Sequence, residues 1–165
     1  MIKLNKRNNR NNIMYNEIYL EEEGGEVFGY NVDFKSDNYK NFLSSNLVNK
    51  DFLNKIIDFI NFKEFCNIVI IKNLNVEDEF RGKGIGKTLL ENAIEEAEIV
   101  FLISDKYESQ VKGFILDKFY ENQDFLKITE TGTGNLMCYP SELAVDIIDY
   151  INKPKISLKI KNINN

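Results

Sequence analysis

The sequence feature that most constrains the fold is a glycine-rich stretch between an apolar run and an amphipathic segment. Residues 81–88 read RGKGIGKT, with three glycines and three cations in the first seven positions. Glycine lets the backbone turn sharply and approach a ligand closely. Where such a loop opens a helix, the first N–H groups point outward at the positive end of the helix dipole and can bind an anion. The stretch therefore predicts a pyrophosphate cradle, with a plain turn as the alternative.

The apolar residues on either side of this stretch differ in period, which indicates the local structure. Residues 67–76 form a continuous β-branched run, as expected for a strand that is covered on both faces. Beyond the glycines, apolar residues recur at helical spacing as far as Ala97, with glutamates largely on the other face. The loop is therefore expected to connect a buried strand to an amphipathic helix, with the acidic turn 77–79 before it.

The same periodicity predicts the elements in the rest of the chain. Gly24 and Gly25 separate two extended runs, which is typical of a hairpin. Asn49 and Asp51 mark a break and a cap between two helices. Ser141 is expected to cap the helix that follows Pro140. Further strands are expected at 13–20, 26–34, 99–103, 126–128 and 136–139, and further helices within 37–65 and 111–119.

A chain of 165 residues is long enough for one ordinary domain. Its mixture of strands and helices predicts the α/β (α+β) fold class. Residues 1–12 are expected to be a disordered polar leader, and residues 13–140 the main domain with a helical segment at 38–65. Residues 141–165 are expected to form a C-terminal helix and an edge strand over 156–160, with lysines facing water.

Composition excludes several classes of function. The chain has no histidine, which removes Ser-His-Asp and Cys-His hydrolases and most zinc sites, so no metal is expected. The net charge of −5 argues against nucleic-acid binding, which needs a basic surface. Cys66 and Cys138 lie in apolar runs and are both expected to be buried. No apolar run is long enough to span a membrane and no signal sequence is evident, so a cytoplasmic protein is expected.

A P-loop is one interpretation of the glycine-rich stretch. It requires Gly, four residues, and then Gly-Lys-Ser/Thr. Gly86, Lys87 and Thr88 match the end of that pattern, but arginine occupies position 81, where the first glycine belongs. The acidic turn also separates the strand from the loop. A P-loop nucleotide-binding protein is therefore the less favoured alternative.

A second interpretation fits better. Arg81-x-x-Gly84-x-Gly86 resembles the Arg/Gln-x-x-Gly-x-Gly/Ala signature of the GNAT N-acetyltransferase family. Downstream, FYENQDF at 119–125 is similar to the family's Leu/Phe-Tyr-Glu-Lys-x-Gly-Phe motif, with Asp124 in place of the usual glycine. The resemblance implies a single domain with a central mixed, mostly antiparallel, splayed sheet flanked by helices. It also implies an acyltransferase that uses acetyl-CoA as co-substrate and an amine as acceptor.

The resemblance implies a role for each part of the site. The backbone of one strand end would pair with the pantetheine arm of acetyl-CoA, and the loop would hold the pyrophosphate. The residues implied for binding are Leu74, Asn75, Val76, Arg81, Gly82, Lys83, Gly84, Ile85, Gly86, Lys87 and Thr88. Tyr120 would protonate the departing thiolate, because a phenol with a pKa near 10 can donate to a thiolate of similar basicity. The amine would attack the thioester directly while a backbone N–H near Val76 polarises the carbonyl.

Three departures from the family pattern affect this mechanism. Helices follow the early hairpin here, so the substrate-facing wall is expected to be rebuilt from residues 38–65. Gly113 occupies a position where many members have an asparagine that contacts the cofactor. The strand 68–76 has no Asp or Glu, where some members have a general base. Glu64, Asp105 and a water chain remain alternatives for that base.

Two further questions stay open at the level of sequence. The acceptor is an amine-bearing small molecule or protein, and the acidic balance favours a cationic one. A non-catalytic CoA-binding module is an alternative to the enzyme, because the asparagine and the base are missing. Many family members form homodimers, and the late strands with the C-terminal tail offer an interface for one.

Overall fold

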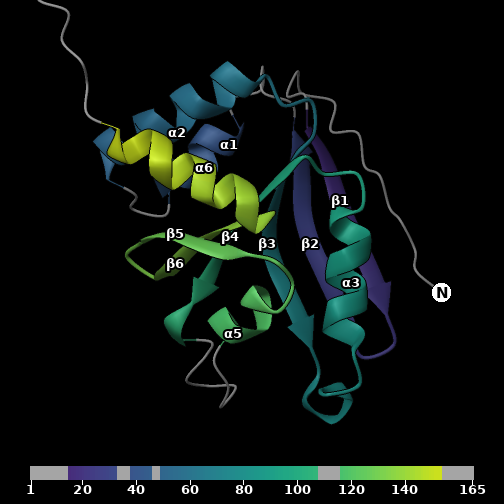
Figure 1. The fold of residues 1–165 in the computed structure, drawn as a ribbon. Helices are drawn as coiled ribbons and strands as arrows, with labels where there is room; N and C mark the ends of the chain where they lie inside the picture. The colour runs from purple at the N-terminus through teal and green to yellow at the C-terminus, as the bar shows by residue number, and fades with distance from the viewer. Residues whose placement is uncertain (1–14, 33–37, 46–48, 108–115, 154–165) are drawn as a thin grey trace, which may run out of the picture.

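The structure, a computed structural model of the chain, describes residues 15–32, 38–45, 49–107 and 116–153. These residues form one mixed six-stranded sheet with helices on both faces (Figure 1). The expected leader at 1–12, the expected edge strand at 156–160 and residues 108–115 lie outside the described residues. The predicted fold class, a single domain built on a mixed sheet, is confirmed.

The strand order of the sheet is β1-β2-β3-β4-β6-β5. Among the described neighbours only β3 and β4 run parallel, and every other pair is antiparallel. The Gly-Gly hairpin is present, because Glu22 pairs with Gly25 and Gly24 has a φ of +81°. The strands are β1 (Tyr15–Glu22), β2 (Gly25–Val32), β3 (Ile68–Val76), β4 (Ile99–Asp105), β5 (Leu126–Glu130) and β6 (Gly134–Tyr139).

The sheet splays between its two parallel strands. β3 and β4 pair only from Ile68–Ile99 to Ile70–Phe101, although β3 continues to Val76 and β4 to Asp105. On its other edge β3 contains a bulge, because Phe28 pairs with Asn73 while Gly29 pairs with Ile71. Such a bulge bends a strand and increases its twist. The second half of β3 is therefore separated from β4, and a gap opens within the sheet.

Alternate residues of the central strands belong to two separate hydrophobic clusters. Ile68 and Ile70 pack in one cluster, whereas Val69 and Ile71 pack in the other. The first cluster includes α1 (Asn38–Ser45), α2 (Lys50–Lys63) and α6 (Ser141–Asn152). The second includes α3 (Ile85–Ile94) and α5 (Leu116–Glu121) (Figure 1). The predicted burial of this strand on both faces thus holds for its first half, 68–71.

One cap prediction is confirmed and another is wrong. The Asn49 side chain accepts hydrogen bonds from the backbone N–H groups of Asp51 and Phe52, at 3.0 and 3.4 Å, and so caps α2. Ser141 does not cap α6, because Pro140 occupies the N-cap position and no side chain caps the helix. The Ser141 hydroxyl instead donates to the Asp124 carboxylate at the end of α5.

The two cysteines differ in exposure. Cys138 lies within β6 and is buried, as expected. Cys66 is exposed, which contradicts the prediction. It lies in the connection between α2 and β3, where the preceding Phe65 takes the buried position.

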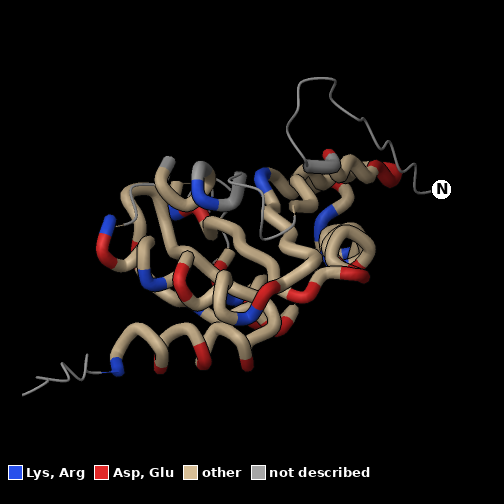
Figure 2. The backbone as a smooth tube through the Cα atoms, turned by 90° about the horizontal axis from the view of Figure 1, so that it is seen from above, with Lys and Arg blue, Asp and Glu red and all other residues tan. Residues whose placement is uncertain are grey.

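Charged residues of both signs are spread over the described chain (Figure 2). The exposed side of α6 carries Glu142, Asp146 and Asp149, while Ala144 and Ile147 face the core. Acidic residues are more numerous in the whole sequence, which gives the net charge of −5. Among the described helices, none combines the length and apolar character needed to span a membrane.

Candidate functional site

The glycine-rich stretch forms a loop that opens α3. Gly84 is the N-cap residue of α3 with a φ of +85°, and Gly82 has a φ of +75°. These are left-handed conformations that glycine adopts without steric cost. A Cβ added to either glycine would meet no heavy atom within 4 Å, so the loop faces open space. The loop therefore has the backbone geometry and the free volume that a bound ligand would require.

The start of α3 is available to an anion. No side chain caps the helix, and the helical bonding begins with the Thr88 N–H, which donates to Gly84 O at 3.0 Å. The N–H groups of residues 85–87, between Gly84 and Thr88, have no acceptor within the helix, because the first N–H groups of an α-helix lack a preceding turn. They lie at the positive end of a ten-residue helix. This end of α3 can therefore hold a phosphate group.

Gly86 brings α3 close to its neighbours. A Cβ at this position would lie 3.3 Å from Val76 Cγ2 and 3.5 Å from Phe119 Cζ. The missing side chain therefore lets the first turn of α3 contact both the end of β3 and α5. This close approach of three elements forms the wall of a cavity.

Arg81 has a structural contact in addition to its charge. Its Nε donates to Val76 O at 3.2 Å, and its guanidinium forms an ion pair with Asp78. Both contacts fold the acidic turn, a 3₁₀ helix at Asp78–Phe80, back against the end of β3. The Glu77 N–H also donates to Gly24 O at 2.8 Å, which joins this turn to the β1–β2 hairpin. Arg81 thereby shapes the loop.

The cations at 83 and 87 also have partners. Lys83 Nζ lies 4.8 Å from the centroid of the Phe80 ring, within the range of a cation–π interaction. Lys87 Nζ is 3.7 Å from the Glu91 carboxylate one turn along α3, and both side chains are more than half exposed. An exposed pair of this kind contributes little to stability, so Lys87 can exchange it for a phosphate.

A first cavity of about 320 Å³ lies between the loop, the end of β3 and α5. Ligand pockets typically have volumes of roughly 300–1,000 Å³. Of the residues predicted for the site, the cavity is lined by Leu74, Val76, Arg81, Gly82, Gly84, Ile85, Gly86, Lys87 and Tyr120. Asn75, Lys83 and Thr88 do not line it, and Asn75 borders a different hollow beside the acidic hairpin.

Three residues of the first cavity were not predicted from the sequence: Phe80, Leu116 and Phe119. Phe80 is the last residue of the acidic turn. An aromatic residue directly before the glycine-rich loop was the sequence signal that could have predicted its place in the cavity. Leu116 and Phe119 lie on α5 one turn and one residue before Tyr120. Their presence makes the wall opposite the loop largely apolar.

Tyr120 is held by the end of α5. Phe125 N donates to Tyr120 O and Asp124 N donates to Glu121 O, both at 3.1 Å, which is the hydrogen-bond pattern of a Schellman motif. Asp124 occupies the left-handed position with a φ of +65°, which explains why glycine is usual there. The rings of Tyr120 and Phe125 lie 5.8 Å apart, so the motif also packs the tyrosine.

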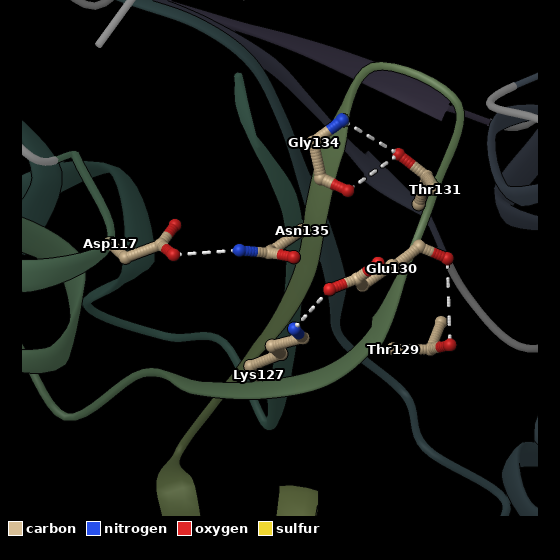
Figure 3. A network of polar contacts seen from close by, with 7 residues as sticks. All are labelled: Asp117, Lys127, Thr129, Glu130, Thr131, Gly134 and Asn135. Carbon is tan, nitrogen blue, oxygen red and sulfur yellow. Dashed lines mark hydrogen bonds and ion pairs between the residues drawn. The ribbon is translucent and has the colours of Figure 1, made fainter. Parts of the chain in front are cut away.

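A polar contact attaches α5 to the sheet behind the site (Figure 3). Asn135 Nδ2 on β6 donates to Asp117 Oδ2 on α5 at 2.6 Å. Asn135 is only 6% exposed, whereas Asp117 is half-buried. In the adjacent turn the Thr131 hydroxyl donates to Gly134 O at 3.0 Å, and Lys127 pairs with Glu130 at 3.1 Å. The helix that carries Tyr120 is therefore fixed to a closed β5–β6 hairpin.

A second cavity of about 150 Å³ opens in the gap between β3 and β4. Leu74 and Tyr120 line both cavities, so the two meet at these residues. The second cavity is also lined by Phe42, Ile71, Lys72, Asn73, Leu102, Ile103, Asp105 and Thr133. Phe42 comes from α1, within the helical segment 38–65.

The candidate bases differ in their location. Asp105 lines the second cavity, and its Oδ1 accepts a hydrogen bond from Tyr107 N at 2.7 Å. Glu64 is exposed at the C-cap of α2 in a left-handed conformation, and it lines neither cavity. Among the described residues, no group of three His, Cys, Asp or Glu side chains is arranged to hold a metal ion.

Comparison with known proteins identifies the family. The acetyltransferase (GNAT) domain matches residues 15–126, which is more than half of the chain. The chain therefore belongs to the GNAT acetyltransferase family. No curated protein matches it.

Two solved structures are similar to this chain. The structure of PH1933 from Pyrococcus horikoshii OT3 has 19% identity and a TM-score of 0.36, over 70% of this chain and 64% of that chain. NAA60 of Arabidopsis thaliana, solved with a bisubstrate analogue, has 14% identity and a TM-score of 0.40, over 76% of this chain and 72% of that chain. This chain thus spans slightly less than two thirds of the PH1933 chain. Because both TM-scores are below 0.5, the family assignment rests on the domain match.

Proposed function

We propose that this protein transfers the acetyl group of acetyl-CoA to a primary amine by direct attack. The observation that supports the proposal best is the first cavity, which is lined by both the glycine-rich loop and Tyr120. The acceptor amine belongs to a small molecule or a protein. The cytoplasmic location and the homodimer expected from the sequence stay predictions.

The shape of the loop fits the diphosphate of acetyl-CoA. In this proposal the N–H groups at the start of α3 donate to the phosphates, and the cations at 83 and 87 offset their charge. The apolar wall of Leu74, Phe119 and Leu116 suits the pantetheine arm, which follows the end of β3. Asn75 and Thr88 would act through backbone or rim contacts, because neither lines the cavity.

The chemistry requires an acid for the leaving thiolate. Attack of the amine nitrogen on the thioester carbon forms the C–N bond, and the C–S bond then breaks. Tyr120 lines the cavity together with Leu74 and Val76 at the end of β3, and it is the single tyrosine among the lining residues. Its hydroxyl would give a proton to the sulfur as the bond breaks. No covalent intermediate on the protein is required.

Two alternatives make different predictions. A non-catalytic CoA-binding module would bind acetyl-CoA and transfer nothing to any amine. Membership of the GNAT family leaves the P-loop interpretation without support. ATP with magnesium nevertheless serves as a control ligand for the loop.

Calorimetric titration of acetyl-CoA tests the cofactor part of the proposal. We expect micromolar binding to the wild-type chain, loss of binding in Gly84→Asp, and no heat with ATP and magnesium. An aspartate would place a negative charge at the N-cap of α3, where the phosphates bind. Gly84→Asn is the matched control, because asparagine has nearly the shape of aspartate and a similar tolerance of the left-handed conformation, without the charge.

The comparison of the two variants separates charge from folding. Circular dichroism should show that both keep the wild-type secondary structure. Equal binding by Gly84→Asp and the wild type would remove the loop from the cofactor site. Absence of binding by a folded wild-type protein would overturn the proposed function.

A further inference from the structure

The β1–β2 hairpin concentrates negative charge without a cation of its own. Residues 15–32 contain five glutamates and no lysine or arginine. Glu21 lies directly opposite Glu26 in the register of the hairpin, and like charges in this position destabilise a sheet. None of the ion pairs between described residues involves a hairpin glutamate. The hairpin therefore has an unfavourable charge distribution that a bound cation would relieve.

A hollow of about 430 Å³ lies against these carboxylates. This volume falls within the roughly 300–1,000 Å³ of ordinary ligand pockets. In its lining, Glu22 Oε2 is buried and has no hydrogen-bond partner, which is unfavourable for a carboxylate oxygen unless a ligand supplies a donor. Besides the two hairpin glycines, this acidic hollow is lined by Glu21, Glu22, Glu23, Glu26, Asn75 and Glu77.

The arrangement of these carboxylates suits spread positive charge better than a compact ion. Among the described residues, no three acidic side chains are grouped closely enough to hold a metal ion. Glu77 comes from the turn after β3, and its N–H donates to Gly24 O at 2.8 Å, so two separate segments supply the charge. A flexible cation with several ammonium groups can meet carboxylates that are distributed in this way.

The sheet face beside the acidic hollow is aromatic. Two rows of side chains cross β1, β2 and β3 on this face, Glu21-Glu26-Asn75 at the hollow and then Tyr19-Phe28-Asn73. Tyr19 and Phe28 belong to neither hydrophobic cluster, and α1, α2 and α6 lie toward the other end of these strands (Figure 1). The Tyr19 hydroxyl donates to Glu26 Oε2 at 3.1 Å and so orients this carboxylate. An oriented carboxylate beside aromatic rings suits an alkylammonium chain.

β3 connects the acidic hollow to the second cavity. Asn75 lines the hollow and Asn73 lines the second cavity, on the same face of the strand and about 7 Å apart along it. Lys72 is the single cation among the described residues that line either space, and it lines the second cavity. A neighbouring cation disfavours a charged amine. A molecule with two amines would therefore place its neutral amine in the second cavity and its ammonium group in the hollow.

We propose that the acidic hollow binds an ammonium group of a linear aliphatic polyamine, whose other terminal amine accepts the acetyl group. This inference rests on the acetyl transfer proposed above. The bound ammonium group donates to the hairpin carboxylates, and the methylene chain passes Phe28 and Asn73 on its way to the gap between β3 and β4. The distance between the two spaces sets the separation of the two nitrogens at about 7 Å or more. The hollow selects the substrate and takes no part in breaking or forming bonds.

The test compares the double variant Glu21→Gln/Glu26→Gln with the wild type on four acceptors: n-butylamine, 1,3-diaminopropane, 1,6-diaminohexane and spermidine. Glutamine keeps an acceptor oxygen for Tyr19 and removes the charge. We expect the ratio of wild-type to variant kcat/KM to be about tenfold larger for diaminohexane and spermidine than for butylamine. Diaminopropane should resemble butylamine, because its nitrogens are too close to span the two spaces. The difference should shrink as salt is added.

The matched control is Glu95→Gln/Glu96→Gln, which removes the same charge at the end of α3. Both glutamates are exposed and line none of the three spaces, so the control should keep the wild-type preference among the amines. Denaturant unfolding adds a second readout. Glu21→Gln/Glu26→Gln should be at least as stable as the wild type, because it removes a pair of opposed like charges. Lower stability with an equal loss of rate for all four amines would show a structural role and overturn the inference.

Calorimetry with spermidine in the absence of acetyl-CoA measures the hollow directly. We expect binding to the wild type that is about tenfold weaker in Glu21→Gln/Glu26→Gln. Equal binding by the two proteins, or wild-type rates independent of chain length, would overturn the inference and leave the proposed transfer intact. A lysine-rich peptide preferred to every polyamine would overturn the assignment to polyamines. A wild-type protein that binds acetyl-CoA but acetylates none of these acceptors would overturn the proposed transfer, and this inference with it.

Discussion

Individual residues of this protein both pack in the core and line a cavity. Tyr120 is 6% exposed and packs between the rings of Phe119 and Phe125, yet it lines both cavities. Gly86 is small because α3, β3 and α5 meet at it. Arg81 belongs to the family signature, but its contacts to Val76 and Asp78 hold the turn in shape. A signature residue at this site can therefore act by positioning the loop.

The role of Tyr120 is tested by Tyr120→Phe. Phenylalanine keeps the ring packing and removes the hydroxyl, so acetyl-CoA affinity should stay within about twofold. We expect kcat to fall by about 100-fold, as is common for loss of a general acid. The basic limb of the pH–rate profile should disappear with it. A variant with wild-type kcat would show that the thiolate leaves without this acid.

The assay for this variant must account for the two cysteines. Cys66 is exposed and would react with a thiol reagent that detects CoA. Burial raises the pKa of the Cys138 thiol, which keeps it protonated and unreactive. A Cys66→Ser background therefore serves as the reference in thiol-release assays.

At the scale of elements, the ends of helices control the site. α3 begins at a glycine without a side-chain cap, and α5 ends in a Schellman motif with an aspartate in the left-handed position. The Asp124 carboxylate accepts a hydrogen bond from Ser141, which links the end of α5 to the start of α6. The unusual aspartate therefore has a partner that glycine would lack.

Substitutions at Asp124 separate these two effects. Asp124→Ala keeps the strained conformation and loses the Ser141 contact, so we expect the free energy of unfolding to fall by about 1–2 kcal/mol. Asp124→Gly relieves the strain and should cost less than the alanine variant. Denaturant unfolding measures both. A glycine variant that is less stable than the alanine variant would contradict the left-handed assignment.

At the scale of the whole molecule, the splayed sheet joins two layers that are otherwise separate. Each hydrophobic cluster fills one face, and the gap between β3 and β4 is where the two cavities meet. The Asp117–Asn135 contact fixes one wall of this gap, because it attaches α5 to β6 (Figure 3). The position of Tyr120 therefore depends on a polar contact between layers.

Removal of that contact should affect both stability and binding. Asp117→Ala leaves the buried Asn135 amide without its acceptor, so we expect a loss of about 1–3 kcal/mol in the free energy of unfolding. Acetyl-CoA affinity should also fall, because α5 forms a wall of the first cavity. Glu121→Ala, an exposed site on the same helix, is the control and should change neither quantity appreciably. Wild-type stability in Asp117→Ala would show that α5 is held by its apolar contacts alone.

The sequence by itself determined the local elements and the family. The strands could be placed because side-chain alternation is a local property of the sequence. The hairpin at Gly24 and the loop at Gly84 could be placed because both depend on the local conformations of glycine. It failed for Ser141 and Cys66, whose environments are set by residues distant in the chain or by the path of a connection. Ser141 lies one residue beyond the N-cap position, and its hydroxyl donates to Asp124.

Only the tertiary structure decided which of the candidate residues lie together. The choice among candidate bases could not be made from spacing, because Glu64 and Asp105 are both acidic residues near strand ends. The splay of β3 from β4 brings Asp105 to the same cavity as Tyr120 and leaves Glu64 outside it. Phe42 reaches that cavity from α1, 30 residues before Lys72 in the sequence. The Lys72 ammonium nevertheless lies over the Phe42 ring. Such contacts follow from the packing of whole elements, which no local pattern encodes.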